Sequence, residues 1–167
     1  MNLQSASAPT DSRIIIPGTY DVTQPPRSTP WGGLQESETL MWGTAPCGTI
    51  TPVLWQVHTA GHGGTRVHPH LAAACFKHLP PECHAHGGSR LWFEEDCESS
   101  VPLFIFYNGL SPDCWLVRTR NAYPREKLLE SVVRWMPSTV EPVRAIANNF
   151  DATLARAGIP LRTPLPA

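Results

Sequence analysis

Proline is the residue type that most restricts how this chain can fold. Eighteen of its 167 residues are proline, compared with an average share of about 5%, and they crowd the two ends of the chain. Proline has no backbone N–H and a fixed φ, so it interrupts both helices and strands. We therefore expect a proline-rich flexible arm over residues 1–30, one folded domain over residues 31–158 and an extended tail over residues 159–167.

The composition restricts the class of protein further. With 41% hydrophobic residues the chain can bury one modest core, and it has no apolar run long enough to span a bilayer. The formal net charge of -1 provides no general positive field to attract a phosphate backbone. The first residues also lack the basic and apolar segments of a secretory signal. We expect a cytoplasmic protein that associates with no membrane and binds no nucleic acid directly.

The middle of the chain carries a strand pattern followed by a short helix. Residues 49–59 are rich in β-branched and aromatic side chains, Gly61–Gly64 interrupts the pattern, and residues 65–68 resume it. This pattern predicts a β-hairpin. Pro69 then opens a short helix that ends before Pro80.

A second apolar segment follows the acidic residues. Residues 101–107 are apolar and form either a buried strand or the end of a helix that begins at the acidic residues; because Pro102 disfavours a helix interior, we expect the strand. Residues 113–120 can pair with this strand across the turn dipeptide Asn108-Gly109.

The C-terminal third predicts two amphipathic helices. Pro124 opens the first helix and Pro137 ends it, whereas Ser138 and Glu141 have the spacing of a capping box for the second, which stops at Gly158. The apolar residues at helical spacing are Leu128, Leu129, Val132, Val133 and Met136 in the first helix, and Val143, Ile146, Ala147, Phe150 and Leu154 in the second. We expect an α+β fold in which these two helices cover one face of a small antiparallel sheet.

Histidine and cysteine are concentrated in one part of the chain. All 7 histidines lie between residues 58 and 86, and Cys75, His78, Cys83 and His86 have the spacing C-x2-H-x4-C-x2-H. Four nitrogen and sulfur ligands are what a structural zinc ion requires, so zinc or another divalent metal is a candidate cofactor. In the alternative interpretation, Cys75 is a buried core thiol and the later histidines lie in a solvated loop.

The segment Gly61-His62-Gly63-Gly64 is a second candidate site. Glycines allow positive φ and close approach of the backbone, so this loop can form an anion nest or an oxyanion hole with His62 as acid, base or ligand. A tight turn explains the same glycines.

The segment Glu94-Glu95-Asp96-Cys97-Glu98 is a third candidate site. In an extended segment Glu94 and Asp96 share a face and can hold a divalent ion, while Glu95 points to the other side. Packed like charges cost free energy unless they are neutralised. A metal ion, an arginine partner such as Arg66 or Arg90, or a helix N-terminus would neutralise them, and of these we favour the helix N-terminus.

Tryptophan suggests a protein partner. The chain has 6 tryptophans, and most of them should lie in the core. Trp31 and Trp42 stand in surroundings rich in glycine and proline, where exposure would mark a binding surface.

Two of these motifs together resemble a known pattern. The segment T-x-G-H-G-G (Thr59 to Gly64) is followed by a Leu- and Ala-rich helix and then by W-F-E-E-D-C-E (Trp92 to Glu98). In this order the chain resembles an uncharacterised family of small proteins encoded on bacterial phages and plasmids, with the typical pattern S-H-G-G followed by W-[FY]-E-E-D-C. The resemblance covers about half of the chain, from Trp55 to Trp135, and implies a mobile-element context. The hallmark residues that it carries over are His62, Gly63, Gly64, Glu94, Glu95 and Asp96.

Two functions from different classes fit these observations. The first, which we favour, is a phage or plasmid accessory protein that binds a host protein complex, for example an inhibitor of bacterial defence of the anti-CRISPR or anti-restriction type. The second is a metal-dependent hydrolase or nuclease-like enzyme in which His62 and the acidic cluster hold a divalent ion that activates water. The catalytic candidates are His62, Glu94, Glu95 and Asp96, and the binding candidates are Gly63, Gly64, Trp31 and Trp42.

Overall fold

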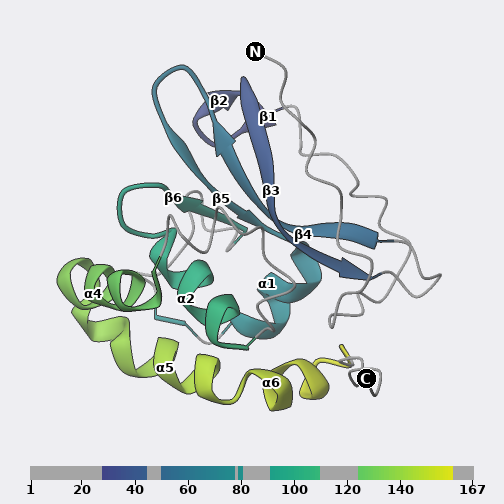
Figure 1. Ribbon diagram of the computed structural model, residues 1–167, viewed down its shortest axis with the longest axis vertical. Helices are drawn as coiled ribbons and strands as arrows, with labels where there is room; N and C mark the ends of the chain where they lie inside the picture. The colour runs from purple at the N-terminus through teal and green to yellow at the C-terminus, as the bar shows by residue number, and fades with distance from the viewer. Residues whose placement is uncertain (1–27, 45–49, 78, 81–90, 110–123, 160–167) are drawn as a thin grey trace.

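The computed structural model describes residues 28–44, 50–77, 79–80, 91–109 and 124–159. Two strands form a small hairpin, namely β1 (Ser28–Thr29) and β2 (Gly32–Gly33). Four strands form an antiparallel sheet in the order β3-β4-β5-β6, namely β3 (Glu36–Thr44), β4 (Ile50–His58), β5 (Gly63–Val67) and β6 (Trp92–Glu94). The helices are α1 (Pro69–Cys75), α2 (Ser100–Gly109), α4 (Arg125–Trp135), the 3-10 helix η4 (Pro137–Thr139), α5 (Val140–Asn148) and α6 (Phe150–Arg156) (Figure 1).

The predicted hairpin is strands β4 and β5. Leu54 pairs with Val67 at one end and His58 pairs with Gly63 at the other. Thr59 closes the turn between the strands: its backbone N–H and its hydroxyl both donate to the His62 carbonyl oxygen, at 2.7 and 2.8 Å. The glycine-rich segment is therefore, first of all, a tight turn.

Helices cover one face of the sheet through a row of aromatic rings. Phe93 of β6 meets Phe76, which directly follows α1, at 5.2 Å between ring centroids. Phe76 meets Phe106 of α2 at 5.9 Å, and Phe106 meets Phe150 of α6 at 5.5 Å, all edge to face. The core thus runs continuously from the sheet through α1 and α2 to α6.

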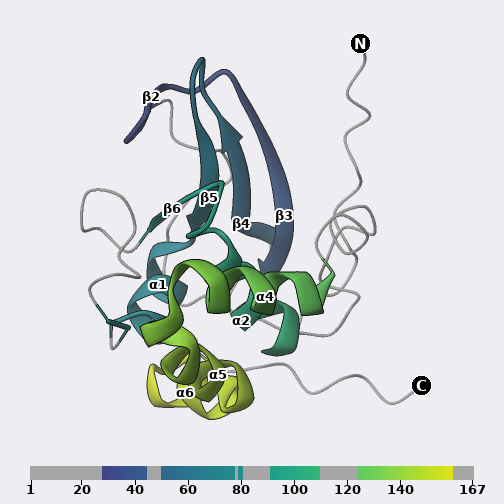
Figure 2. The ribbon, with the colours of Figure 1, turned by 90° about the vertical axis from the view of Figure 1, so that its left-hand side faces the viewer.

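The C-terminal helices form the outer layer of this arrangement. Helices α4, α5 and α6 pack mainly on α1 and α2, which lie between them and the sheet (Figures 1 and 2). The α+β class and the small antiparallel sheet are confirmed. Helices α1 and α2 therefore separate the sheet from the C-terminal helices that were expected to cover it.

The expected strand over residues 101–107 is wrong, because this segment is helix α2. Pro102 stands in the first turn, where a backbone N–H has no acceptor within the helix, so its missing N–H costs nothing. The side chains from Val101 to Phe106 are all buried, and a helix buried on every side shows no amphipathic period. The strand expected over residues 113–120 lies outside the described residues.

The last predicted helix forms as two shorter helices, α5 and α6. It breaks at Asn149, whose side-chain amide donates to the Ala145 carbonyl oxygen at 2.9 Å and whose own carbonyl accepts from Thr153. At its start, α5 begins after Thr139, whose side chain makes no capping hydrogen bond, and Ser138 lies in the preceding 3-10 helix η4. The five apolar side chains predicted along this segment are nevertheless buried or half-buried.

Two further observations concern the extent of the domain. Strand β1 begins at Ser28, slightly inside the range predicted for the N-terminal arm. In the ranges that the structure describes, every helix is too short or too polar to cross a membrane.

Candidate functional site

Strands β5 and β6 bring the two sequence motifs together. Gly64 pairs with Glu94 and Arg66 pairs with Trp92. Beyond the last pair, the Glu95 N–H donates to the Gly63 carbonyl oxygen at 3.2 Å. The glycine-rich turn and the acidic segment, about thirty residues apart in the chain, thus form one end of the sheet.

The two glycines of β5 are required for close packing. A Cβ atom on Gly63 would collide with the Glu95 carboxylate and would lie 2.9 Å from Nδ1 of His58. A Cβ atom on Gly64 would collide with the Phe93 carbonyl oxygen and with the Trp31 indole. Neither glycine has a positive φ, so the motif provides room for neighbouring groups and does not form the anion nest that was one of its interpretations.

An arginine and three tryptophans gather next to these glycines. Strand register places Trp55, Arg66 and Trp92 side by side on three neighbouring strands. The Arg66 guanidinium lies 5.0 Å from the Trp55 ring and 5.4 Å from the Trp92 ring, within the range of a cation–π interaction. Trp31, between β1 and β2, meets Trp92 edge to face at 6.0 Å. We call these four residues the Trp–Arg cluster.

Two guanidinium nitrogens of Arg66 have no acceptor within the described residues. These are Nε and Nη1, which are both buried, and burial lowers the pKa of the guanidinium. In the described chain no carboxylate forms an ion pair with Arg66, so this alternative for neutralising the acidic cluster is not found there. Arg90, the other proposed partner, lies outside the described residues.

The acidic residues form a turn that leads into α2. The Glu94 carboxylate accepts from the Asp96 N–H at 2.9 Å, and the Glu98 carboxylate accepts from the Glu94 N–H at 3.1 Å. Because residues 95–99 form a turn, the extended geometry that would place Glu94 and Asp96 on one face is absent. Carboxylates just before a helix also interact favourably with its N-terminal partial charge, as one of the alternative interpretations proposed.

A histidine that the sequence motifs do not single out, His58, lies at this end of the sheet. Nδ1 of His58 lies 3.9 Å from a carboxylate oxygen of Glu95, and these side chains are 48% and 35% exposed. The predicted hairpin could have indicated this histidine, because it places His58, the last residue of β4, opposite Gly63. His62, the predicted catalytic histidine, is exposed in the neighbouring turn.

The predicted zinc ligands fall mostly outside the described residues, which include Cys75 but not His78, Cys83 or His86. Cys75 is buried, and burial raises the pKa of its thiol to about 12. Metal ions bind the thiolate form, so this environment fits the core-thiol interpretation. Where the structure describes the chain, no three His, Cys, Asp or Glu side chains form a group that could hold a metal ion, and this applies to His62, Glu94 and Asp96.

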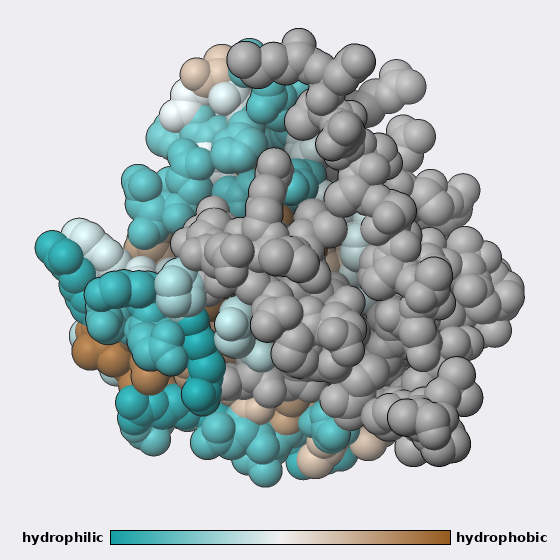
Figure 3. Space-filling model, viewed as in Figure 1, coloured by the Kyte–Doolittle hydropathy of each residue, from teal (hydrophilic) through white to brown (hydrophobic). Residues whose placement is uncertain are grey.

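The tryptophans differ from expectation in their exposure. Trp31 and Trp42 are half-buried, and Trp42 lies on β3, two strands away from Arg66. The exposed large apolar side chains are on α4 instead: Val133 is 47% exposed and Trp135 is 57% exposed. Figure 3 shows hydrophobic surface around this helix, at the lower left. The guanidinium of Arg134 lies 4.9 Å from the Trp135 ring.

These features define a small α+β domain whose sheet carries a Trp–Arg cluster beside an acidic turn. The chain belongs to the family described as a domain of unknown function (DUF7007), whose model matches residues 24–156. This range includes both sequence motifs and every described helix and strand. No curated protein and no solved structure matches the chain.

Proposed function

We propose that this protein is an accessory protein of a phage or plasmid that binds a host protein complex and inhibits a bacterial defence system. The binding surface is the end of the sheet formed by the Trp–Arg cluster and the acidic turn. The mobile-element context comes from the sequence resemblance. Arg66, the other residues of the Trp–Arg cluster and the acidic turn each support binding to a protein.

The main observation behind the proposal is that two guanidinium donors of Arg66 have no acceptor in the described residues. A buried guanidinium N–H without an acceptor costs free energy, about 1–3 kcal/mol for a neutral group and more for a charged one. The two such donors of Arg66 are held between Trp55 and Trp92. These two nitrogens are themselves buried, but Arg66 as a whole keeps intermediate exposure, so an acceptor on a partner protein can approach the exposed part of a guanidinium that is already oriented.

The residue types of the cluster also support a protein partner. Tryptophan and arginine are enriched among the few residues that dominate the free energy of protein–protein binding. Trp31 belongs to this cluster and is half-buried on the side formed by the β1–β2 hairpin. It therefore offers part of its ring to a partner while its other part packs on Trp92.

The acidic turn supplies charge for recognition. Glu95 and Asp96 are exposed, and Glu95 lies directly beside Gly63 and the end of β4. Exposed carboxylates at the rim of an interface steer association with a basic partner surface. A defence complex that binds nucleic acid presents such a basic surface.

The test is inhibition of purified defence complexes by the full chain. A CRISPR effector complex and a restriction enzyme are each incubated with the protein, and cleavage of target DNA and direct binding by calorimetry are measured. We expect one class of complex to be bound and inhibited, and the variants Arg66→Met and Glu95→Lys each to weaken binding at least tenfold.

Matched controls separate the surface from general effects. Arg144→Met removes an exposed arginine on α5, and Glu130→Lys reverses an exposed charge on α4, so both should bind like the unaltered protein. Binding to neither class of complex, or full binding by Arg66→Met, would contradict the proposal. Binding that disappears only with a chelator would favour the metal-dependent hydrolase, which has less support because His62, Glu94 and Asp96 do not converge.

A further inference from the structure

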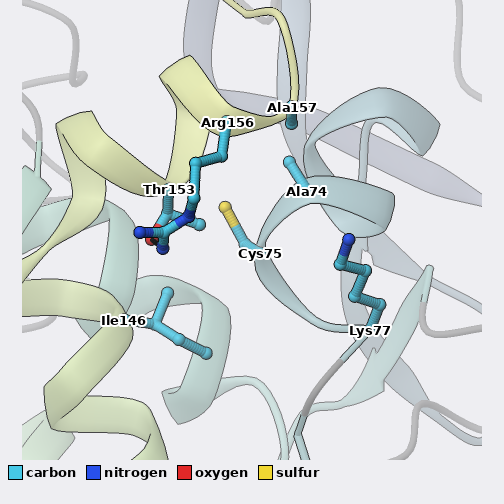
Figure 4. Close-up of a pocket in the computed structure, with 7 residues that line it drawn as sticks. All are labelled: Ala74, Cys75, Lys77, Ile146, Thr153, Arg156 and Ala157. Atoms are coloured by element: carbon cyan, nitrogen blue, oxygen red, sulfur yellow. Dashed lines mark hydrogen bonds between the residues drawn. The ribbon is translucent and has the colours of Figure 1, made fainter.

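A cavity of about 350 Å³ lies among α1, α5 and α6. It is separate from the sheet end described above, because none of its lining residues belongs to the Trp–Arg cluster or to the acidic turn. Its volume is within the range of pockets that bind small molecules. The lining residues are Ala74, Cys75, Lys77, Ile146, Thr153, Arg156 and Ala157 (Figure 4).

The walls of this cavity are apolar on one part and cationic on another. Ala74, Cys75 and Ile146 supply the apolar part, and Ala74 and Cys75 are buried. Lys77 and Arg156 are exposed cations that also line the cavity, and no carboxylate is among its lining residues. Figure 4 shows Arg156 and Thr153 on one side of the Cys75 sulfur and Lys77 on the other. The cavity is therefore amphipathic, with an excess of positive charge.

The arginine is oriented by its neighbour. Nη2 of Arg156 donates to the Thr153 hydroxyl at 3.2 Å. In the described chain neither Arg156 nor Lys77 forms an ion pair with a carboxylate. Arg156 thus keeps donors available while one of them holds its position beside the cavity.

The C-terminal ends of two helices offset only part of this positive charge. Arg156 is the last residue of α6, and Lys77 follows α1 by two residues. Each helix C-terminus carries roughly half a negative charge, so the two ends offset about one of the two positive charges. A net positive charge remains for a ligand.

We propose that this cavity binds a small organic acid, with its carboxylate held by Lys77 and Arg156 and a short apolar body against Ala74, Cys75 and Ile146. The binding is non-covalent and leaves the buried Cys75 thiol unchanged. An ammonium ligand of the same shape is rejected by the two cations, and a neutral one lacks the ion pairs.

The experiment compares three probes of similar size on the full chain. Octanoate, octanamide and octylammonium are titrated by calorimetry below their micelle concentrations, and the unfolding temperature is followed in parallel. We expect octanoate to bind with one-to-one stoichiometry and to raise the unfolding temperature, octanamide to bind at least tenfold more weakly, and octylammonium not to bind. No binding of octanoate, or equal binding of all three probes, would overturn the proposal.

Variants locate the site. Lys77→Gln and Arg156→Gln change exposed side chains, so the fold should persist in both, as checked by circular dichroism. Each should weaken octanoate binding about tenfold, since a charge-assisted hydrogen bond contributes about 1.5–3 kcal/mol. The control is Arg144→Gln, an exposed arginine of α5 that does not line the cavity. Unchanged octanoate affinity in the double variant of Lys77 and Arg156 would show that the acid binds elsewhere and would refute the site.

Discussion

Gly64 occupies a position on β5 at which no larger side chain fits. Its neighbours are the Phe93 carbonyl oxygen, which is backbone, and the Trp31 indole. We expect Gly64→Ala to lower the free energy of unfolding by about 1–3 kcal/mol, because overpacking forces neighbouring groups to shift. Urea unfolding followed by tryptophan fluorescence measures this change.

Gly61 provides the matched control for that substitution. A Cβ atom on Gly61 would meet nothing within 4 Å, and its φ is not positive. Gly61→Ala should therefore leave the stability within about 0.5 kcal/mol of the unaltered protein. Equal effects of the two substitutions would show that the contact with Trp31 and Phe93 does not restrict this position.

His68 makes the stability depend on pH. Its Nδ1 atom accepts from the His70 N–H at the start of α1. Burial, and then the charges of His70 and Arg66, lower its pKa from 6.5 to about 4. The folded protein therefore holds His68 neutral over a range in which the unfolded chain binds a proton.

The direction of the pH effect follows from this difference. Between pH 6.5 and about 4 the unfolded chain binds more protons, so the free energy of unfolding decreases as the pH falls through this window. We expect a loss of about 3 kcal/mol from this residue. His68→Asn keeps a side-chain acceptor at the helix start and should reduce the loss. The measurement is urea unfolding of both proteins at several pH values, and parallel pH profiles would contradict this role.

At the scale of single elements, the start of helix α2 is held by hydrogen bonds of the residue before it. Its start depends on Ser99, a buried residue whose hydroxyl donates to the Phe93 carbonyl oxygen at 2.9 Å and whose carbonyl accepts from Leu103. We expect Ser99→Ala to lower the free energy of unfolding by about 1 kcal/mol, because the buried Phe93 carbonyl loses a donor. The neighbouring substitution Ser100→Ala, at a half-buried residue, is the control and should change it by a few tenths of a kcal/mol. Similar losses in both variants, measured by urea unfolding, would mean that helix propensity and not this hydrogen bond matters.

At the scale of the whole molecule, the row of aromatic rings connects the sheet, the inner helices and the outer helices. Phe106 contacts both Phe76 and Phe150, so it joins the inner helices to the outer layer. We expect Phe106→Ala to lower the free energy of unfolding by about 3–5 kcal/mol, since it leaves a cavity in the core. Calorimetry should still show one transition if the layers unfold together.

Trp135→Ala removes a larger ring at an exposed position and serves as the comparison. Trp135 is 57% exposed, whereas Phe106 is 0% exposed. The substitution should change the free energy of unfolding by about 0.5 kcal/mol or less. A loss comparable to that of Phe106→Ala would indicate that α4 buries this ring in solution.

The sequence by itself determined the elements whose patterns are local. The β4–β5 hairpin, the start of α1 at Pro69 and the helix α4 follow from the spacing of apolar side chains and the positions of Gly and Pro, which act within a few residues. It also singled out the glycine-rich turn and the acidic segment as the two unusual motifs, and several of their residues belong to the candidate site.

Only the tertiary structure decided what those motifs touch and how the apolar segments are used. Residues 101–107 are apolar throughout, so no period distinguishes a buried strand from a buried helix, and packing between the sheet and the outer helices decided for α2. The contacts of Gly64 with Trp31 and of Arg66 with Trp55 and Trp92 join residues from different strands. The cavity beside Cys75 likewise needs three helices. Such contacts depend on strand register and helix packing, which the whole chain sets together and no short segment encodes.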